Sequence, residues 1–199
     1  MKVLLFGHSF VRDLLSVGGW NREVSLDDDS KVNLEFLFRY YSGKDFNYFL
    51  NNLELFDEIK SINPDAIVII LGGNIIVDEV SNSSIKLMVN DFYRRLKEVV
   101  KPDCIKFAAQ IEPRYCHKGN RFGAPEAEEF NRRRTQINNH FNQTVKKHKL
   151  VDYLIFSRED FKHRPELYKP DGVHLTHEGL ELYKGSVLGG LMYALNRRQ

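Results

Sequence analysis

The sequence predicts an α/β protein, built as a three-layer α/β/α sandwich around a five-stranded parallel sheet. Two observations predict this class. Short apolar runs of strand length alternate along the chain with longer stretches whose apolar residues recur at helical spacing. The run at 66–71 is also uninterrupted and rich in branched residues, which is typical of a parallel strand buried on both faces. Alternation of this kind favours a parallel sheet covered by helices on both sides.

Composition indicates one domain that spans residues 1–199. The chain is 42% hydrophobic and 12% aromatic, which suits a sizeable core. Its formal net charge of +2 comes from nearly balanced acids and bases, so no strong overall field indicates nucleic acid or an anionic membrane as a partner. The N-terminal apolar run is too short for a signal peptide, and no stretch is long enough to span a bilayer. We therefore expect an intracellular protein without a membrane span, and the sequence gives no oligomeric state.

The two cysteines, Cys104 and Cys116, do not indicate a secreted protein. They are too few for a disulfide framework and lack the spacing of a metal site, although one bridge between them stays open. A reduced setting is the default expectation.

The elements follow in order from the apolar pattern. A strand at 3–6 stops at Gly7 and leads into a helix, whereas residues 20–30 have no periodicity and predict a solvated loop. Alternating residues predict a half-exposed strand at 31–40, which suits the edge of the sheet. The later elements are one or two helices from Phe46 to about Asn63, a central strand at 66–71, a helix at 85–99, a strand at 104–111, a loop at 112–125, a helix from about Glu126 to Lys149, a strand at 151–156 and a closing helix at 180–195.

Right-handed crossovers and the half-polar second strand favour the flavodoxin-like order 2-1-3-4-5 for these five strands. In such a sheet, ligands bind beyond the carboxyl ends of the strands, near the point where the order reverses. We therefore expect functional side chains in the loops that follow the strands. The loops after the third and fourth strands, with Trp20 and its neighbours, are expected to form the walls of a pocket.

Ser9 occupies the turn between the first strand and the first helix. A serine hydroxyl in that place stands clear of the sheet edge, and unpaired helix N–H groups face any anion that forms beside it. Taken alone, Ser9 is more simply a helix N-cap. The far end of the chain changes this balance, because Asp171 and His174 lie three residues apart in a turn before the closing helix. An Asp tethered close to a His can fix the imidazole tautomer and stabilise the imidazolium, so the three residues are a candidate catalytic triad.

Two further loops carry candidate hydrogen-bond donors. Gly43 follows the second predicted strand and can bring its backbone N–H close to a substrate, because it has no side chain. Asn74 follows the third predicted strand and can offer a side-chain N–H. With the backbone N–H of Ser9, they would supply three donors aimed at one oxyanion.

These residues resemble the SGNH or GDSL-type hydrolases, a family named for serine, glycine, asparagine and histidine in separate blocks. The blocks here are Gly7-His8-Ser9, Gly43, Gly72-Gly73-Asn74-Ile75 and Asp171-Gly-Val-His174. The resemblance covers essentially the whole chain. It implies Ser9 as nucleophile, His174 as base, Asp171 as the residue that orients the base, and an oxyanion hole from Ser9, Gly43 and Asn74. It also implies hydrolysis of an ester or thioester of a small molecule, lipid or carbohydrate through an acyl-enzyme, with no metal or organic cofactor.

The sequence departs from the family at two positions, because His8 and Ile75 stand where the family usually has Asp. Both carboxylates usually help to hold their loops. His8 is either structural or a second titrating group in the pocket. His177 is more simply a surface residue at the start of the closing helix than a metal ligand. Arg114 is either a surface arginine or a group that reaches a substrate carboxylate or phosphate.

A second hypothesis is a binding module on the same fold that has lost turnover. The opening Gly-His-Ser-Phe-Val-Arg, the Pro-Arg-Tyr loop and the Asn-Arg-Arg helix are also similar, more loosely, to esterase-like domains in proteins of some LINE-type retrotransposons. Arg132 to Arg134 could touch the phosphates of a nucleic acid, although a solvated helix face is the commoner explanation. Because Ser9, Asn74 and His174 are all present, the hydrolase is the first hypothesis.

Overall fold

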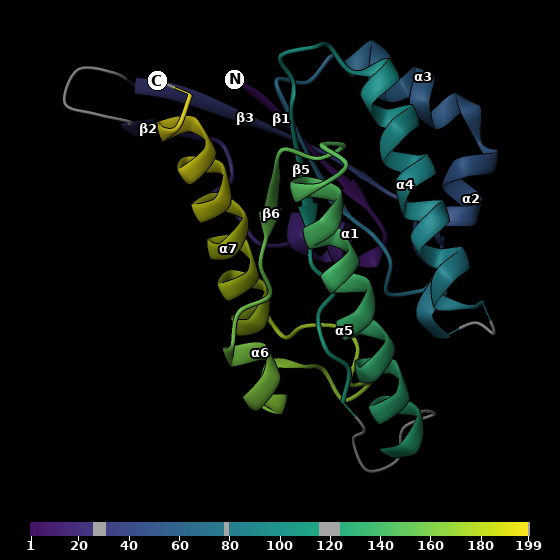
Figure 1. The fold of residues 1–199 in the computed structure, drawn as a ribbon. Coiled ribbons are helices and arrows are strands. Elements are labelled where there is room, and N and C mark those ends of the chain that lie inside the picture. The colour runs from purple at the N-terminus through teal and green to yellow at the C-terminus, as the bar shows by residue number, and fades with distance from the viewer. Residues whose placement is uncertain (26–30, 78–79, 116–123, 199) are drawn as a thin grey trace.

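A six-stranded sheet runs through the centre of the computed structural model, in the order β2-β3-β1-β4-β5-β6 (Figure 1). The structure describes residues 1–25, 31–77, 80–115 and 124–198. The strands are β1 (Lys2–Gly7), β2 (Arg22–Ser25), β3 (Lys31–Tyr40), β4 (Ala66–Ile70), β5 (Ile105–Ala109) and β6 (Tyr153–Ile155). The predicted α/β class is therefore confirmed.

The five predicted strands are parallel neighbours in the predicted order, but the sheet has one strand more. β2 pairs antiparallel with the first four residues of β3. The expected loop at 20–30 is thus wrong at Arg22–Ser25, and Lys31–Tyr40 is not the outermost strand. The reason is that Val24 is the one partly buried residue of β2, so this strand has no apolar alternation to detect. Residues 26–30, with the acidic triplet, lie outside the described part of the chain.

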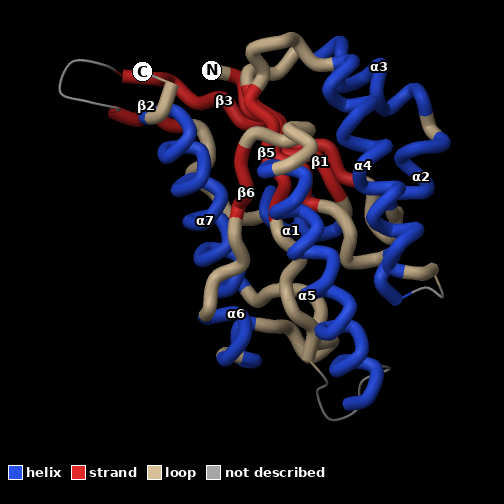
Figure 2. Tube along the Cα trace, in the orientation of Figure 1, coloured by secondary structure: helices blue, strands red, loops and turns tan. Residues whose placement is uncertain are grey.

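Helices cover both faces of the sheet (Figures 1 and 2). They are α1 (Ser9–Leu15), α2 (Phe46–Asn51), α3 (Leu53–Ile62), α4 (Asn82–Val99), α5 (Ala124–Lys146), α6 (Asp160–His163) and α7 (His177–Asn196), with short 3-10 turns η1 (Ile75–Val77) and η2 (Pro165–Leu167). Val3 and Leu5 of β1 pack in one core with α1 and α7, whereas Leu4 and Phe6 pack in a second core with α2 to α5. Alternate residues of a strand point to opposite faces, so β1 belongs to both cores.

The helix expectations are confirmed with small shifts of their ends. The stretch after Phe46 forms two helices, α2 and α3, and α5 begins at Ala124 and ends at Lys146. All five residues of β4 are buried between β1 and β5, as expected for the central strand. Within the described residues, none of the helices is both long enough and apolar enough to cross a membrane.

Candidate active site

The turn between β1 and α1 places Ser9 as the first residue of the helix. Gly7 ends the strand so close to β4 that a Cβ there would lie 2.1 Å from the carbonyl oxygen of Ile70. His8 then caps α1, because its Nδ1 accepts a hydrogen bond from the backbone N–H of Phe10 at 3.4 Å. The simpler interpretation of Ser9 as the N-cap is therefore wrong. The cap belongs to His8, and the hydroxyl of Ser9 is available for other contacts.

The structure brings Ser9, His174 and Asp171 together in one hydrogen-bonded chain. His174 Nδ1 lies 2.6 Å from Asp171 Oδ2, and His174 Nε2 lies 3.0 Å from Ser9 Oγ. A carboxylate can only accept, so Nδ1 carries the proton and Nε2 presents its lone pair to the hydroxyl. This order of acid, imidazole and hydroxyl is the arrangement in which a serine can lose its proton to a histidine.

The loop that carries Asp171 and His174 is held at several points. The other oxygen of Asp171 accepts the backbone N–H groups of Val173 and His174, both at 2.9 Å. Partial burial by itself raises the pKa of Asp171, but the hydrogen bonds from His174 and from these two amides lower it below its usual value overall. Gly172 takes a φ of +68°, and its carbonyl accepts the backbone N–H of Tyr115 from the loop after β5. The aspartate is therefore kept ionised and fixed in place.

Asn74 and Gly43, the two other expected oxyanion donors, come from neighbouring loops. In the structure, the side chain of Asn74 is bonded to a backbone carbonyl. Asn74 lines the same pocket as Ser9, and its side-chain Nδ2 donates to the carbonyl of Lys44 at 2.9 Å. Gly43 sits in the turn just before Lys44 with a φ of +75°, a conformation that favours glycine. The loops of the second and third blocks are thus tied together. The roles of both residues as oxyanion donors stay a prediction.

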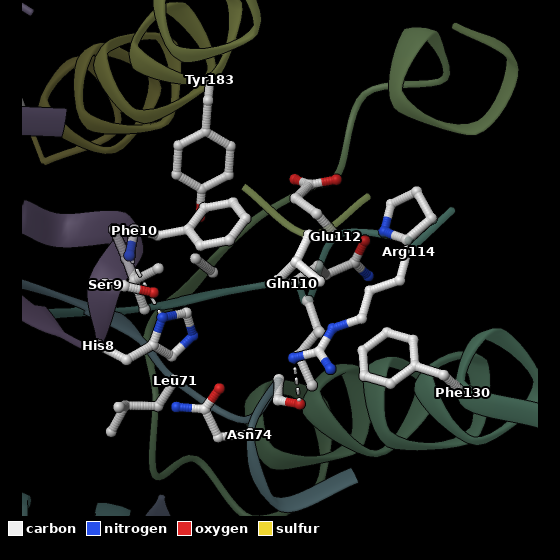
Figure 3. Close-up of a pocket in the computed structure, with 16 residues that line it drawn as sticks. His8, Ser9, Phe10, Leu71, Asn74, Gln110, Glu112, Arg114, Phe130 and Tyr183 are labelled. Carbon is white, nitrogen blue, oxygen red and sulfur yellow. Dashed lines mark hydrogen bonds between the residues drawn. The ribbon is translucent and has the colours of Figure 1, made fainter. Parts of the chain in front are cut away.

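A small pocket, with about 30 Å³ open to the centre of a water-sized sphere, lies beside Ser9 (Figure 3). Its walls come from the turn after β1, the loops after β4 and β5, and residues of α5 and α7, and they include His8, Phe10, Gly73, Asn74, Gln110, Glu112, Arg114, Phe130 and Tyr183. The expected contribution of the loops after β4 and β5 is confirmed. Trp20 is instead buried, where it donates to the carbonyl of Leu14 and packs on Phe36, so its expected place in the pocket wall is wrong.

His8 is an uncharged member of this pocket. Burial, followed by the positive charge of Arg114, lowers the pKa of His8 to about 3. The ring is therefore neutral at physiological pH, which argues against a second titrating base. The other departure from the family, Ile75, is fully buried in the core with α2 to α5. Its surroundings there are apolar, whereas the resemblance implies a carboxylate at this position.

Arg114 is half-buried and forms part of the pocket wall. Its Nη2 donates to the carbonyl of Gly73 at 3.0 Å, and its guanidinium lies 4.2 Å from the ring centre of Phe130. The side chain of Asn131 accepts the Arg114 backbone N–H and donates to its carbonyl. Burial lowers the pKa of Arg114 to about 10, so it keeps its positive charge.

Sequence reasoning missed a buried polar cluster that includes Glu112, one of the residues lining the pocket. Glu112 is bound to the hydroxyl of Ser157, and burial raises the pKa of Glu112 to about 8. Its Oε1 has no partner among the described residues, nor do Nε of Arg134 and the hydroxyl of Tyr168. The one available signal was that Glu112 directly follows the apolar run predicted as a strand at 104–111.

The basic stretch of α5 is mostly used inside the protein. Arg134 is buried and donates to the carbonyl of Ile111, and Arg133 donates to the carbonyls of Ile76 and Val80. Arg132 is exposed and pairs with Glu129. The expected solvated face is therefore wrong for Arg134 and in part for Arg133. The nucleic-acid hypothesis loses most of the cations on which it depended.

The remaining candidates for metal or disulfide chemistry are His177, Cys104 and Cys116. His177 is exposed at the first position of α7, as expected for a surface residue. In the part of the chain that the structure describes, no three His, Cys, Asp or Glu residues gather closely enough to hold a metal ion. Cys104 is buried as a free thiol, and Cys116 lies outside the described residues.

Comparison with solved structures identifies the fold. An acetyl esterase mutant with bound acetate superposes with a TM-score of 0.67 at 13% identity, over 100% of both chains. A GDSL-like lipase from Bacteroides thetaiotaomicron gives a TM-score of 0.66 at 16% identity, over 97% of this chain and 88% of that one. The chain has the fold of the SGNH/GDSL esterases and lipases. A carbohydrate esterase family 3 protein from Talaromyces cellulolyticus shares this fold, with a TM-score of 0.66 at 15% identity over 100% and 99% of the chains. No protein-family model and no curated protein sequence matches the chain.

Proposed function

We propose that the protein is a serine hydrolase of the SGNH type that cleaves an acyl or O-acetyl ester through an acyl-enzyme. The observation that carries this proposal is the chain of hydrogen bonds from Asp171 through His174 to Ser9, beside an open pocket. The esterases and lipases that share the fold add support for an ester as the class of substrate.

In the first half of the reaction, Ser9 Oγ attacks the ester carbonyl carbon while His174 Nε2 takes the hydroxyl proton. The carbonyl oxygen becomes an oxyanion, and the backbone N–H of Ser9, the side chain of Asn74 and the backbone N–H of Gly43 are the donors expected to stabilise it. The bond to the alcohol oxygen then breaks, and His174 returns the proton to that oxygen. Ser9 now carries the acyl group.

In the second half, a water molecule takes the place of the alcohol. His174 removes one of its protons as it attacks the acyl carbon, and the bond to Ser9 Oγ breaks. The proton returns to Oγ, and the carboxylic acid leaves and ionises. Asp171 stabilises the imidazolium in both halves and holds the tautomer of His174 in which Nε2 is free to act as the base.

Hydrolysis of p-nitrophenyl acetate, butyrate and octanoate tests the proposal. Ser9→Ala and His174→Ala are each expected to lower kcat by about a thousandfold or more, because members of a triad act as a unit. Ser61→Ala removes an exposed hydroxyl on α3 and serves as the matched control with wild-type activity. A folded wild type that is no faster than Ser9→Ala refutes the proposal.

A further inference from the structure

His8 has one ring nitrogen committed to the protein and one directed at the pocket. The residue is 7% exposed, and its Nδ1 accepts the backbone N–H of Phe10. A nitrogen that accepts carries no proton, so the neutral ring holds its proton on Nε2. Figure 3 shows this second nitrogen turned toward the interior of the pocket. Among the described residues it meets no hydrogen-bond acceptor, so His8 is a buried N–H donor that faces open space.

Arg114 reaches the same space from another wall. A Cβ built on Gly73 would lie 3.8 Å from His8 Nε2 and 3.5 Å from Arg114 Nη2. Because glycine leaves this position empty, the two nitrogens border the space in front of Gly73. One of them is a neutral donor and the other carries a positive charge, a combination that suits an anionic oxygen.

Among the described residues, Glu112 lines the same pocket and Asp171 acts electrostatically on Arg114. Burial raises the pKa of Glu112 to about 8, so at neutral pH this carboxyl is mostly protonated. Asp171 is ionised, but it is paired with His174. Within the described part of the pocket, Arg114 therefore supplies a positive charge.

The position of the pocket relative to the triad indicates which part of an ester it receives. The pocket is lined by Ser9 but not by His174. The leaving alcohol must lie beside His174 Nε2, because it takes its proton there, whereas the acyl carbon becomes bonded to Ser9 Oγ. The pocket is thus on the acyl side of the scissile bond.

We propose that His8 Nε2–H is a substrate donor and that the pocket selects short acyl groups ending in a carboxylate, such as a succinyl group. This inference rests on the hydrolase function proposed above. His8 donates to a carboxylate oxygen of the acyl group, and Arg114 supplies the opposite charge. An Asp at position 8, as is usual in the family, would present a second carboxylate and repel such a substrate, so the histidine changes the charge preference of the site.

Three phenyl esters with acyl groups of the same shape test the proposal. The succinate monoester ends in a carboxylate, the levulinate in a methyl ketone and the 4-methylpentanoate in an isopropyl group. For the wild type, after correction for spontaneous hydrolysis, kcat/KM is expected to be about tenfold or more higher for succinate than for 4-methylpentanoate, the range of a hydrogen bond to a charged group. The levulinate is expected to lie between them.

Two variants of nearly equal size, His8→Asn and His8→Asp, separate the role of His8 as a substrate donor from its role as the helix cap. Asn and Asp at position 8 can both accept the backbone N–H of Phe10, but at neutral pH only Asn can also donate. His8→Asp is therefore expected to lose the succinate preference, and His8→Asn to keep most of it. Each preference is a ratio measured within one enzyme, so general losses of activity or folding cancel.

Each outcome separates the inference from the proposed function. The inference is overturned if the wild type has no succinate preference, if His8→Asp keeps the preference, or if both variants lose it equally, since that would assign His8 a purely structural role. Hydrolysis of all three esters without preference leaves the hydrolase proposal standing. A wild type that hydrolyses none of them, nor p-nitrophenyl acetate, refutes the hydrolase proposal and this inference together.

Discussion

Replacing Glu112 by Gln is expected to stabilise the protein at alkaline pH. The carboxyl is buried, bound to the Ser157 hydroxyl, and has a pKa raised from 4.5 to about 8, mainly by burial. Gln has nearly the same shape and can keep the contact with Ser157, but it never ionises. The variant therefore avoids the cost of placing a negative charge in the core.

The sign and size of the effect follow from proton linkage. Between pH 4.5 and 8, the folded wild type holds a proton on Glu112 that the unfolded chain releases, so its stability falls as the pH rises. Each pKa unit corresponds to about 1.4 kcal/mol. Over this range, the free energy of unfolding of Glu112→Gln, relative to that of the wild type, should therefore increase by up to about 5 kcal/mol. Below pH 4.5 both side chains are neutral, and no gain is expected.

Urea unfolding at pH values from 4.5 to 8.5 measures this difference. Every other titrating group is common to the two proteins, so their difference isolates Glu112. Glu98→Gln, which changes an exposed glutamate of α4, is the matched control and should run parallel to the wild type. If Glu112→Gln also runs parallel to the wild type, the carboxyl does not have a raised pKa and the account of the cluster is wrong.

Three further predictions follow from the geometry. Gly7→Ala should lower the free energy of unfolding by about 2 kcal/mol, because its Cβ would meet the Ile70 carbonyl. The control Gly185→Ala, at an open position of α7, should not lower it, and equal urea midpoints for the two variants would contradict this prediction. Asp171→Asn should lower kcat for p-nitrophenyl acetate by about a thousandfold or more in a protein that still folds, because the imidazole takes the wrong tautomer. Full activity would refute the role of Asp171. Burial lowers the pKa of His8 from 6.5 to about 3, so the wild type should lose stability relative to His8→Asn as the pH falls through this range. Thermal midpoints that change in parallel with pH would show that the pKa of His8 is not lowered.

The parts of the site that could be predicted are those set by local pattern and topology. Ser9 follows an apolar strand and begins a helical pattern, and Asp171 and His174 share a short turn. Both features are local, and a parallel sheet brings the loops after its strands to one edge. The three side chains could therefore be matched across 165 positions of sequence.

The parts that could not be predicted depend on burial, which is a property of the folded whole. His8 and Glu112 are polar residues whose sequence neighbours do not show that they are enclosed, and enclosure is what shifts their pKa values. Arg134 sits in a run of arginines that is typical of an exposed helix face, yet the loop after β5 covers it. β2 was missed because it is stabilised by pairing with β3 rather than by an apolar face.

The central claim, that Ser9 is an activated nucleophile, is tested most directly by locating a covalent label. The protein is treated with a fluorophosphonate, and the modified peptide is identified by mass spectrometry. The account predicts one adduct on Ser9 of the wild type and a strongly reduced yield in His174→Ala, because the hydroxyl loses its base. An adduct on another residue such as Ser157, or no adduct where a known serine hydrolase is labelled, would contradict it.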